Sequence, residues 1–421
     1  MSEPIIYAAS WLINPGAPPV AGGALLVRNG IISDTGTLNV LRDTYSAPVL
    51  DFPGCVLLPG FVNAHTHLEL THFPSWRLRS QVDYNPRRFT DWIIQLIKIS
   101  RGLAATDYPP SVREGVRMCL ESGTTAIGEI VTNPLLVELY YKSPIFGRLY
   151  FELLGQEHKH FTSKLAAASA AVDLNMGERL PAGLAPHSPY TIAHEYFAAV
   201  RDAAASRSLP LSVHLSESRS EADFLYDGTG ELASSFYPFV GWEQFLGHPA
   251  RCSSTELLDR HGVLTSTTLV VHCVHVSVAD ARILKSRGVH IALCPRSNYL
   301  LDVGRAPVHL FKKIGIPLAL GTDSLASNNS LSLWDELRFA LEIFPGDLSE
   351  QDVFNMVTSG GAAALGISAS CGSLEAGKRA DFQVIGNCDG SDQGVLERVM
   401  REGTLQEVYV GGVRYAGNVQ T

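Results

Sequence analysis

The chain repeats a short apolar run followed by a longer stretch with helical spacing of its apolar residues. Runs rich in Val, Leu and Ile and bounded by Gly or Pro are typical of buried strands. Eight such runs occur, at residues 55–63, 123–129, 147–153, 182–187, 211–214, 268–272, 289–294 and 316–323. The helix candidates are residues 89–100, 110–122, 163–175, 193–207, 278–287 and 331–343. Eight strands alternating with helices predict an α/β fold, a (β/α)8 barrel of the TIM type.

The two ends of the chain have a different pattern. Residues 22–32 form a hairpin pattern around Asn29-Gly30, a pair that favours a two-residue turn. Apolar or alternating runs at 380–386 and 407–415 have the same character. We therefore expect both ends to pair into a small β-sandwich domain beside the barrel. The predicted boundaries are 1–56 plus 370–421 for this domain and 57–369 for the barrel.

One long connection follows the fifth apolar run. Residues 225–249 are rich in Gly, Ser and aromatic residues, and they are predicted to form an elaborated loop over the barrel mouth. Loops in this position usually shape the choice of substrate.

Composition narrows the class of protein. A chain of 421 residues with 46% hydrophobic and 18% charged residues is typical of a globular protein, and a net charge of −9 argues against nucleic acid or an acidic membrane as partner. Seven scattered cysteines without a C-x-x-C pair indicate reduced thiols. No signal peptide and no membrane-spanning run is recognisable, so a cytoplasmic location is expected.

Ionisable side chains at the ends of four predicted strands form a candidate metal site. Because alternate residues of a strand face the same side, His65 and His67 both point into the barrel mouth. His214 and Asp323 would complete a shell of three imidazoles and one carboxylate, which suits zinc or ferrous iron. Such an ion leaves a position for water and lowers its pKa towards roughly 7.

Two further residues lie where they can assist that water. Glu217, one turn past His214, is placed to carry a proton from water to a leaving group. His272 ends the sixth strand, where it can orient water or stabilise developing charge. Asp323 can also accept a proton through its second oxygen. Because His187 stands where binuclear barrel hydrolases often have a bridging Lys, one metal ion is predicted.

Six segments carry a resemblance to a known family. They are Pro59-Gly-Phe-Val-Asn-Ala-His-Thr-His, His214-Leu-Ser-Glu, His272-Cys-Val-His, Cys294-Pro-Arg-Ser-Asn, Gly321-Thr-Asp-Ser-Leu-Ala-Ser-Asn-Asn and Gly372-Ser-Leu-Glu-Ala-Gly-Lys-Arg-Ala-Asp. The whole chain resembles the amidohydrolase superfamily, in its branch of deaminases and chlorohydrolases of nitrogen heterocycles. The resemblance implies that His65, His67, His214 and Asp323 bind metal, that Glu217 and His272 are catalytic, and that His187 touches the substrate.

The resemblance also gives an order of candidate substrates. His67-Leu-Glu-Leu resembles the aminodeoxyfutalosine deaminases of menaquinone biosynthesis, in which Glu69 would accept hydrogen bonds from ribose hydroxyls. Arg77 and Arg79, with Arg87 and Arg88, form a basic loop suited to a substrate carboxylate. We therefore expect 6-amino-6-deoxyfutalosine first. S-adenosylhomocysteine or methylthioadenosine comes second, then guanine, then hydrolytic dechlorination of a triazine.

Other readings stay open at this stage. The arginines are as consistent with a solvated face, and a barrel that has lost its chemistry would act as a binding protein. Glu129 and Glu152 could be mouth residues or buried structural carboxylates. His72 and His275 are expected to be loop or supporting residues. The expected partners are a small heterocyclic substrate and a second copy of the chain in a homodimer.

Overall fold

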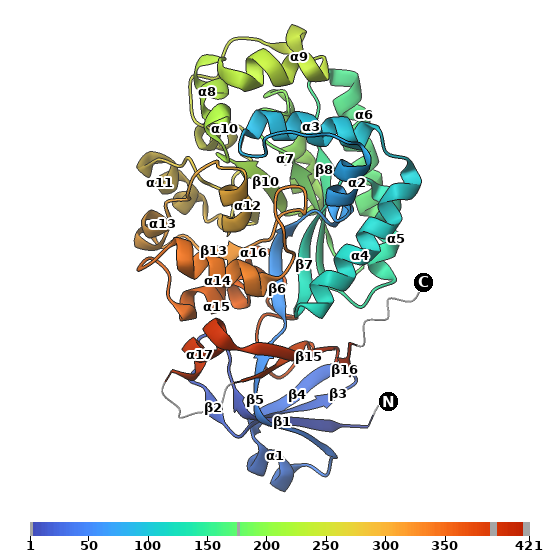
Figure 1. Ribbon diagram of the computed structural model, residues 1–421, viewed down its shortest axis with the longest axis vertical. Helices are drawn as coiled ribbons and strands as arrows, with labels where there is room; N and C mark the ends of the chain where they lie inside the picture. The colour runs from blue at the N-terminus through green and yellow to red at the C-terminus, as the bar shows by residue number, and fades with distance from the viewer. Residues whose placement is uncertain (1–2, 175–176, 388–393, 416–421) are drawn as a thin grey trace.

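The computed structural model describes residues 3–174, 177–387 and 394–415. Asn175, the last residue of one predicted helix, and Cys388 lie outside these ranges. The molecule has two parts, a barrel and a smaller sheet built from both chain ends, which lies below the barrel in Figure 1.

Eight parallel strands form the barrel and neighbour one another in chain order. They are β6 (Phe61–Thr66), β7 (Thr124–Val131), β8 (Phe146–Leu153), β9 (Ala182–Pro186), β10 (Leu211–Leu215), β11 (Thr268–His272), β12 (His290–Leu293) and β13 (Leu318–Leu320). The last strand returns to the first: Thr66 and Asp323 form a parallel bridge, and the Asp323 amide donates to the His65 carbonyl at 3.1 Å. The predicted (β/α)8 barrel is confirmed.

Helices surround these strands, and all six predicted helices form. They are α3 (Phe89–Arg101), α4 (Tyr108–Glu121), α6 (His158–Leu174), α7 (Tyr196–Arg207), α11 (Val278–Arg287) and α14 (Leu333–Ile343). Shorter helices complete the ring: α2 (Phe73–Arg79), α5 (Val137–Tyr141), α10 (Ser254–Arg260), α12 (Pro295–Leu300), α13 (Val308–Ile314), α15 (Glu350–Met356) and α16 (Ser359–Ala364).

The first predicted strand, residues 55–63, is divided at Gly60. Residues up to Pro59 belong to β5 (Val49–Pro59) of the end sheet, and β6 begins at Phe61. A Cβ at Gly60 would lie 2.1 Å from the Thr125 Oγ1, so the backbone passes close to β7 here. The prediction of one continuous barrel strand is wrong, because two buried strands with only Gly60 between them give the same apolar run.

The end sheet is built from strands near both ends of the chain, as predicted. It contains β1 (Ile5–Leu12), β2 (Val20–Ala21), β3 (Gly23–Arg28), β4 (Ile31–Thr37), β5, β14 (Phe382–Gly386), β15 (Thr404–Val410) and β16 (Val413–Arg414). β5 pairs in parallel with β1 and antiparallel with β14, so the strands form one continuous mixed sheet. The predicted turn is present, with φ of 51° at Asn29 and 78° at Gly30.

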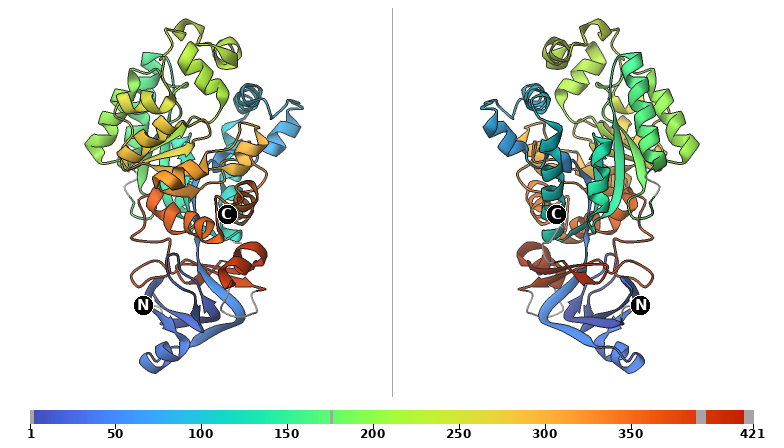
Figure 2. Two further views of the ribbon diagram at one scale, coloured as in Figure 1. Left: turned by 90° about the vertical axis from the view of Figure 1, so that its left-hand side faces the viewer. Right: turned by 90° about the vertical axis from the view of Figure 1, so that its right-hand side faces the viewer.

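Apolar clusters lie on both faces of this sheet. Ile6 and Leu26 pack with Leu41 of α1 (Leu38–Thr44) on one face, and Tyr7 packs with Phe382 on the other. α17 (Val395–Glu402) joins the barrel core instead. The C-terminal segment therefore contributes to both parts of the molecule, as the turned views in Figure 2 show.

The stretch predicted as a loop at 225–249 is largely helical. It contains the end of α8 (Arg219–Asp227), a π-helical turn η4 (Leu232–Phe236), α9 (Tyr237–Val240) and a short turn η5 (Glu243–Phe245). Leu232, Phe236 and Tyr237 pack against Phe89 and Trp92 of α3. We call residues 219–245 the lid segment; it lies with α3 at the upper end of the barrel in Figure 1. Among the described helices, none combines the length and apolar character needed to cross a membrane.

Candidate metal centre and active site

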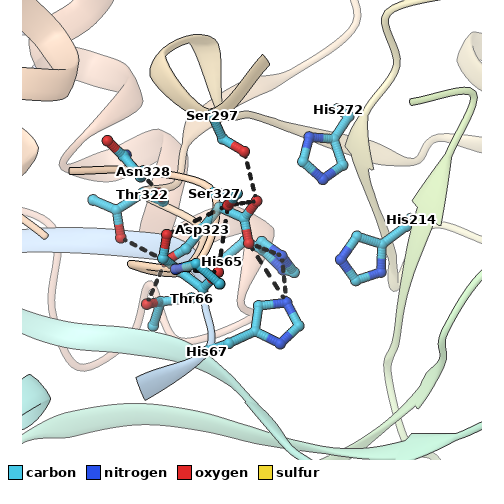
Figure 3. Close-up of polar contacts among 12 residues, drawn as sticks. His65, Thr66, His67, His214, His272, Ser297, Thr322, Asp323, Ser327 and Asn328 are labelled. Carbon is cyan, nitrogen blue, oxygen red and sulfur yellow. Dashed lines mark hydrogen bonds and ion pairs between the residues drawn. The ribbon is translucent and has the colours of Figure 1, made fainter. Parts of the chain in front are cut away.

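The four predicted metal ligands meet at the C-terminal ends of their strands. His65 lies in β6 and His67 directly after it, His214 lies in β10, and Asp323 follows β13. The Nε2 atoms of His65 and His67 are 3.2 Å apart, and they lie 3.8 and 3.7 Å from the Asp323 Oδ1. Figure 3 shows the rings and this carboxylate turned towards a common centre, with His272 beside it.

Neighbouring groups hold these side chains with one atom left for a ligand bond. The His214 Nδ1 donates to the His187 carbonyl at 2.9 Å, which leaves its Nε2 as an acceptor. The Asp323 Oδ2 accepts hydrogen bonds from the Ser297 and Ser327 hydroxyls, each at 2.7 Å, which leaves Oδ1 facing the histidines. Such outer contacts are typical of metal sites, because they fix the orientation of each ligand.

The ionisation states also suit a divalent cation. Burial lowers the pKa of His65 and of His214 well below the usual range, so both rings are neutral, as metal ligation requires. Burial alone would raise the pKa of Asp323, but the nearby His67, His272 and His65 rings bring it down to about 2. His65, His67, His214 and Asp323 therefore form a buried His/His/His/Asp metal site.

Glu217 and His272 lie next to this centre. The Glu217 Oε1 is 3.6 Å from the His272 Nε2, and both side chains are buried. Burial, with the charges of Asp323 and Glu221 next, raises the pKa of Glu217 well above its usual range. The His272 Nδ1 donates to the Asn298 Oδ1 at 2.9 Å, and burial lowers the pKa of this ring. A carboxyl that keeps its proton thus faces a neutral imidazole.

A cavity of about 790 Å³ opens above these groups. His67, His214, Glu217, His272 and Asp323 form part of its lining. Apolar side chains from α3 and the lid segment supply much of the rest: Trp92, Ile93, Leu96, Ile97, Phe236, Val240, Trp242 and Phe245. The cavity is large enough for a nucleoside with a long substituent.

The two predicted substrate residues that are not arginines also line this cavity. The Glu69 Oε1 accepts hydrogen bonds from the Thr132 and Asn133 amides at 2.9 and 3.0 Å. Burial raises the pKa of Glu69 to about 8. His187 follows β9, and its Nδ1 lies 3.0 Å from the Thr191 Oγ1.

Arg77 and Arg79, predicted to bind substrate, are placed elsewhere. Arg77 pairs with Asp83 at 3.4 Å and Arg79 with Asp107 at 2.9 Å, and neither lines the cavity. Arg87 and Arg88 are likewise paired, with Asp302 and Glu231. The structure therefore favours the solvated-face interpretation for these arginines.

Two other cations face the cavity. Arg101, at the end of α3, and Lys164 of α6 both line it. Among the residues that the structure describes, no carboxylate forms a salt bridge with either of them. Sequence reasoning missed both, because each lies on a helix far along the chain from the metal motifs.

The structure also shows where the other carboxylates and histidines considered in the sequence analysis lie. Glu129 is fully buried and accepts hydrogen bonds from the Leu68 amide at 2.9 Å and the Tyr140 hydroxyl at 2.6 Å, so it is structural. Glu152 lines the cavity. The His275 Nε2 lies 2.8 Å from the Val303 carbonyl and the His72 amide donates to the Ser111 Oγ, as expected of loop residues.

The sequence motifs contained further supporting residues whose roles we did not predict. Ser297 and Asn298 stand in the motif at 294–298, and Ser327 in the motif at 321–329. Ser297 and Asn298 contact Asp323 and His272, each 26 residues away, so only the three-dimensional structure reveals these two contacts, whereas Ser327 contacts Asp323 within the same motif.

Fold and site together define a metal-dependent hydrolase built on a (β/α)8 barrel. The chain belongs to the Amidohydrolase family, whose family model matches residues 56–414. It is 32% identical to the 5-methylthioadenosine/S-adenosylhomocysteine deaminase of Desulforudis audaxviator (strain MP104C) over 380 residues, covering 86% of this chain and 81% of that protein. It is also 28% identical to the aminodeoxyfutalosine deaminase of Deinococcus radiodurans, over 82% of this chain and 81% of that protein.

A solved structure extends the comparison to the fold. The adenosine deaminase from Xanthomonas campestris with bound zinc has a TM-score of 0.81 and 23% identity, over 97% of this chain and 92% of that one. The expected enzyme class is thus confirmed: the chain is a metal-dependent deaminase that hydrolyses C–N bonds.

Proposed function

We propose that this enzyme deaminates a 6-aminopurine nucleoside with a large 5′ substituent, and that 6-amino-6-deoxyfutalosine is its substrate. The observation that carries the proposal is the cavity, which has the buried Glu217 and His272 beside the metal site and apolar walls leading away from it. The 28% identity with an aminodeoxyfutalosine deaminase supports this choice, and so does Glu69, which lines the cavity and was predicted from the sequence to bond the ribose hydroxyls.

The proposed metal is a single zinc ion held by His65, His67, His214 and Asp323. When bound, it supplies the Lewis acidity that makes water a nucleophile at neutral pH. Zinc is proposed rather than iron because the Xanthomonas campestris deaminase contains zinc, whereas three imidazoles and a carboxylate suit either metal.

The proton transfers are assigned to Glu217. Water adds to the amino-bearing ring carbon, one water proton reaches the adjacent ring nitrogen, and the other reaches the amino group, which leaves as ammonia. A carboxyl with a strongly raised pKa can give a proton to the ring nitrogen and take one from water in the same cycle. His272, held by Asn298, orients the attacking oxygen with its free Nε2.

Asp323 keeps the two roles predicted from the sequence. Its Oδ1 faces the histidines, and its Oδ2, already held by two serine hydroxyls, is the proposed second proton acceptor. His187 and Glu69 are assigned to the substrate. The Glu69 oxygen that no amide contacts is the one proposed to bond the ribose hydroxyls, since the other oxygen is occupied by two amides.

Arg101 and Lys164 replace the loop arginines as the proposed carboxylate-binding groups. Both line the cavity, and an anionic tail would give each an opposite charge, although Arg101 already lies over the Phe239 ring. A flat aromatic tail would also pack against the apolar wall formed by α3 and the lid segment.

Methylthioadenosine or S-adenosylhomocysteine is the second candidate. It is favoured by the 32% identity with a deaminase named for these substrates. Guanine and chlorinated triazines are smaller than the cavity and rank below both. A cytoplasmic location and a homodimer remain predictions.

The test is ammonia release by the zinc-loaded enzyme on aminodeoxyfutalosine, S-adenosylhomocysteine, methylthioadenosine, adenosine and guanine. We expect the highest kcat/KM on aminodeoxyfutalosine, with KM raised in Arg101→Ala and Lys164→Ala but unchanged in Arg79→Ala. Preference for the adenosine thioethers would overturn the substrate and keep the reaction. Equal KM values in all three variants would overturn the carboxylate assignment.

A further inference from the structure

Glu221 is a fully buried carboxylate outside the cavity, in the first turn of α8. Its two oxygens accept hydrogen bonds from the backbone amides of the two residues that directly follow β10. The Ser216 amide donates to Oε1 at 2.9 Å, and the Glu217 amide donates to Oε2 at 3.0 Å. The Ser254 hydroxyl makes a third, short contact with Oε1. The Glu221 side chain is thus hydrogen-bonded to the backbone of Glu217 and of the residue before it.

The backbone at Ser216, which Glu221 holds, has an unfavourable conformation. Ser216 has φ of 52°, in the left-handed region that residues with a Cβ adopt rarely. The Ser216 carbonyl also accepts the His275 amide at 2.9 Å, so this residue is held from both sides. The turn at Ser216 takes the chain out of β10 and brings Glu217 to 3.6 Å from His272.

We propose that Glu221 is a positioning residue that holds Ser216 in this conformation and so fixes the Glu217 carboxyl against His272. The inference rests on the proposed role of Glu217 as the proton carrier. Glu221 itself touches neither the cavity nor the metal site. Its effect on the reaction is therefore transmitted through two backbone amides.

The main variant is Glu221→Gln, which keeps the shape of the side chain. A glutamine presents one acceptor oxygen and one NH2 donor, so one of the two backbone amides would face a donor. We expect kcat to fall about a hundredfold, the loss typical of a misplaced catalytic group, with little change in KM and full metal content. Ser254→Ala is the matched control, because it removes one donor to the same carboxylate and leaves both backbone amides bonded. Its kcat should stay within about twofold of the wild type.

Amide hydrogen exchange provides a readout that does not depend on catalysis. In the metal-free protein, the Ser216 and Glu217 amides should exchange faster in Glu221→Gln than in the wild type or in Ser254→Ala. Unchanged exchange would overturn the proposal, and so would normal kcat in Glu221→Gln. If Glu217→Gln proves to have normal turnover, the proposed role of Glu217 fails, and the exchange of these two amides alone decides whether Glu221 holds them.

Rescue separates positioning from simple structural support. Glycine adopts positive φ readily, so Ser216→Gly should restore at least about tenfold of the lost kcat when combined with Glu221→Gln. A structural defect elsewhere would not respond to this change, and absence of rescue would contradict the proposal. Ser216→Val tests the same turn with Glu221 intact: a β-branched residue disfavours positive φ, so kcat should fall with metal retained. Normal kcat in that variant would also overturn the proposal.

Discussion

Buried carboxyl groups surround the reaction centre, and the partners of each one set its state. Asp323 is flanked by histidines and held by two serines, and its pKa falls to about 2. Burial, followed by the charges of Asp323 and Glu221, raises the pKa of the Glu217 carboxyl well above its usual range. The same chemical group is therefore charged in one residue and holds a transferable proton in the other.

The first prediction concerns Glu217. Glu217→Gln should retain metal and lose at least about a hundredfold in kcat, because an amide cannot carry the proton. His67→Ala provides the contrast, since it should lose the metal as well as the activity. Elemental analysis and ammonia release on the same samples measure both. A Glu217→Gln enzyme with near-normal turnover would contradict the proton-carrier role.

The second prediction concerns Glu336, which is fully buried in α14. It accepts the Arg296 amide at 2.9 Å and the Asn328 Nδ2 at 3.2 Å, and burial raises its pKa to about 8 from a usual value near 4.5. The folded state therefore binds an extra proton between these values, and the contribution of this group to stability falls as pH rises through that window.

Glu336→Gln does not titrate, so its stability relative to the wild type should increase from pH 5 to pH 8. Urea unfolding of the metal-free proteins at several pH values measures the difference. The comparison removes the contributions of the other buried carboxyls, which are common to both proteins. A difference that stays constant across this range would show that Glu336 keeps its ordinary pKa.

At the scale of elements, the sequence was informative where local pattern decides the structure. The barrel strands and the six long helices follow from apolar periodicity, and His65, His67, His214 and Asp323 could be found because each lies at or shortly after the C-terminal end of a strand. The division at Gly60 was hidden, since residues 56–59 before it and 61–66 after it are all buried. The helical turns of the lid segment were missed although Leu232, Phe236 and Val240 have helical spacing.

Contacts between distant elements were beyond the sequence. Arg79 of α2 and Arg101 of α3 are basic residues on helices that follow the first barrel strand, yet only Arg101 lines the cavity, while Arg79 pairs with Asp107. Glu221 stands in the same motif region as Glu217, but only the folded chain shows that its oxygens meet two backbone amides.

The third prediction concerns the junction between the two sheets. Gly60→Ala should destabilise the protein by about 1–3 kcal/mol, because the new Cβ would lie within 3 Å of three Thr125 side-chain atoms. Gly36→Ala in β4 is the control, since a Cβ there has no neighbour within 4 Å, and its effect should stay within about 0.5 kcal/mol. Urea unfolding measures both. Equal stabilities of the two variants would contradict a tight junction.

At the scale of the whole molecule, side chains hydrogen-bond the barrel to the end sheet. The Gln383 side chain of β14 accepts the Trp334 Nε1 at 3.0 Å and donates to the Pro59 carbonyl at 3.0 Å. Arg338 of α14 donates to the Gly403 carbonyl at 2.7 Å, beside α17. The end sheet is thus part of the support for the barrel.

The fourth prediction tests the expected domain boundaries. Residues 57–369 expressed alone should fail to fold stably or bind zinc, because they lack β14, α17 and most of β5, against which Phe61 and Trp334 pack. A chain of residues 1–415 is the control and should bind one equivalent of zinc. Circular dichroism and elemental analysis measure the outcome. A folded, zinc-binding fragment would show that the barrel is independent of the sheet.

The way in which both sheets are closed has a consequence for synthesis of the protein. The Thr66 hydroxyl bonds the carbonyl of Asp323, 257 residues away, and the Tyr7 hydroxyl bonds that of Gly412, 405 residues away. Such distant pairings make folding slow. During synthesis, the N-terminal histidines of the site are made long before Asp323, and the N-terminal strands are made long before the C-terminal strands with which they pair. The four-ligand metal site therefore cannot be complete before Asp323 has been synthesised, and the unfinished barrel is the form of the chain that exposes strand edges and apolar surface.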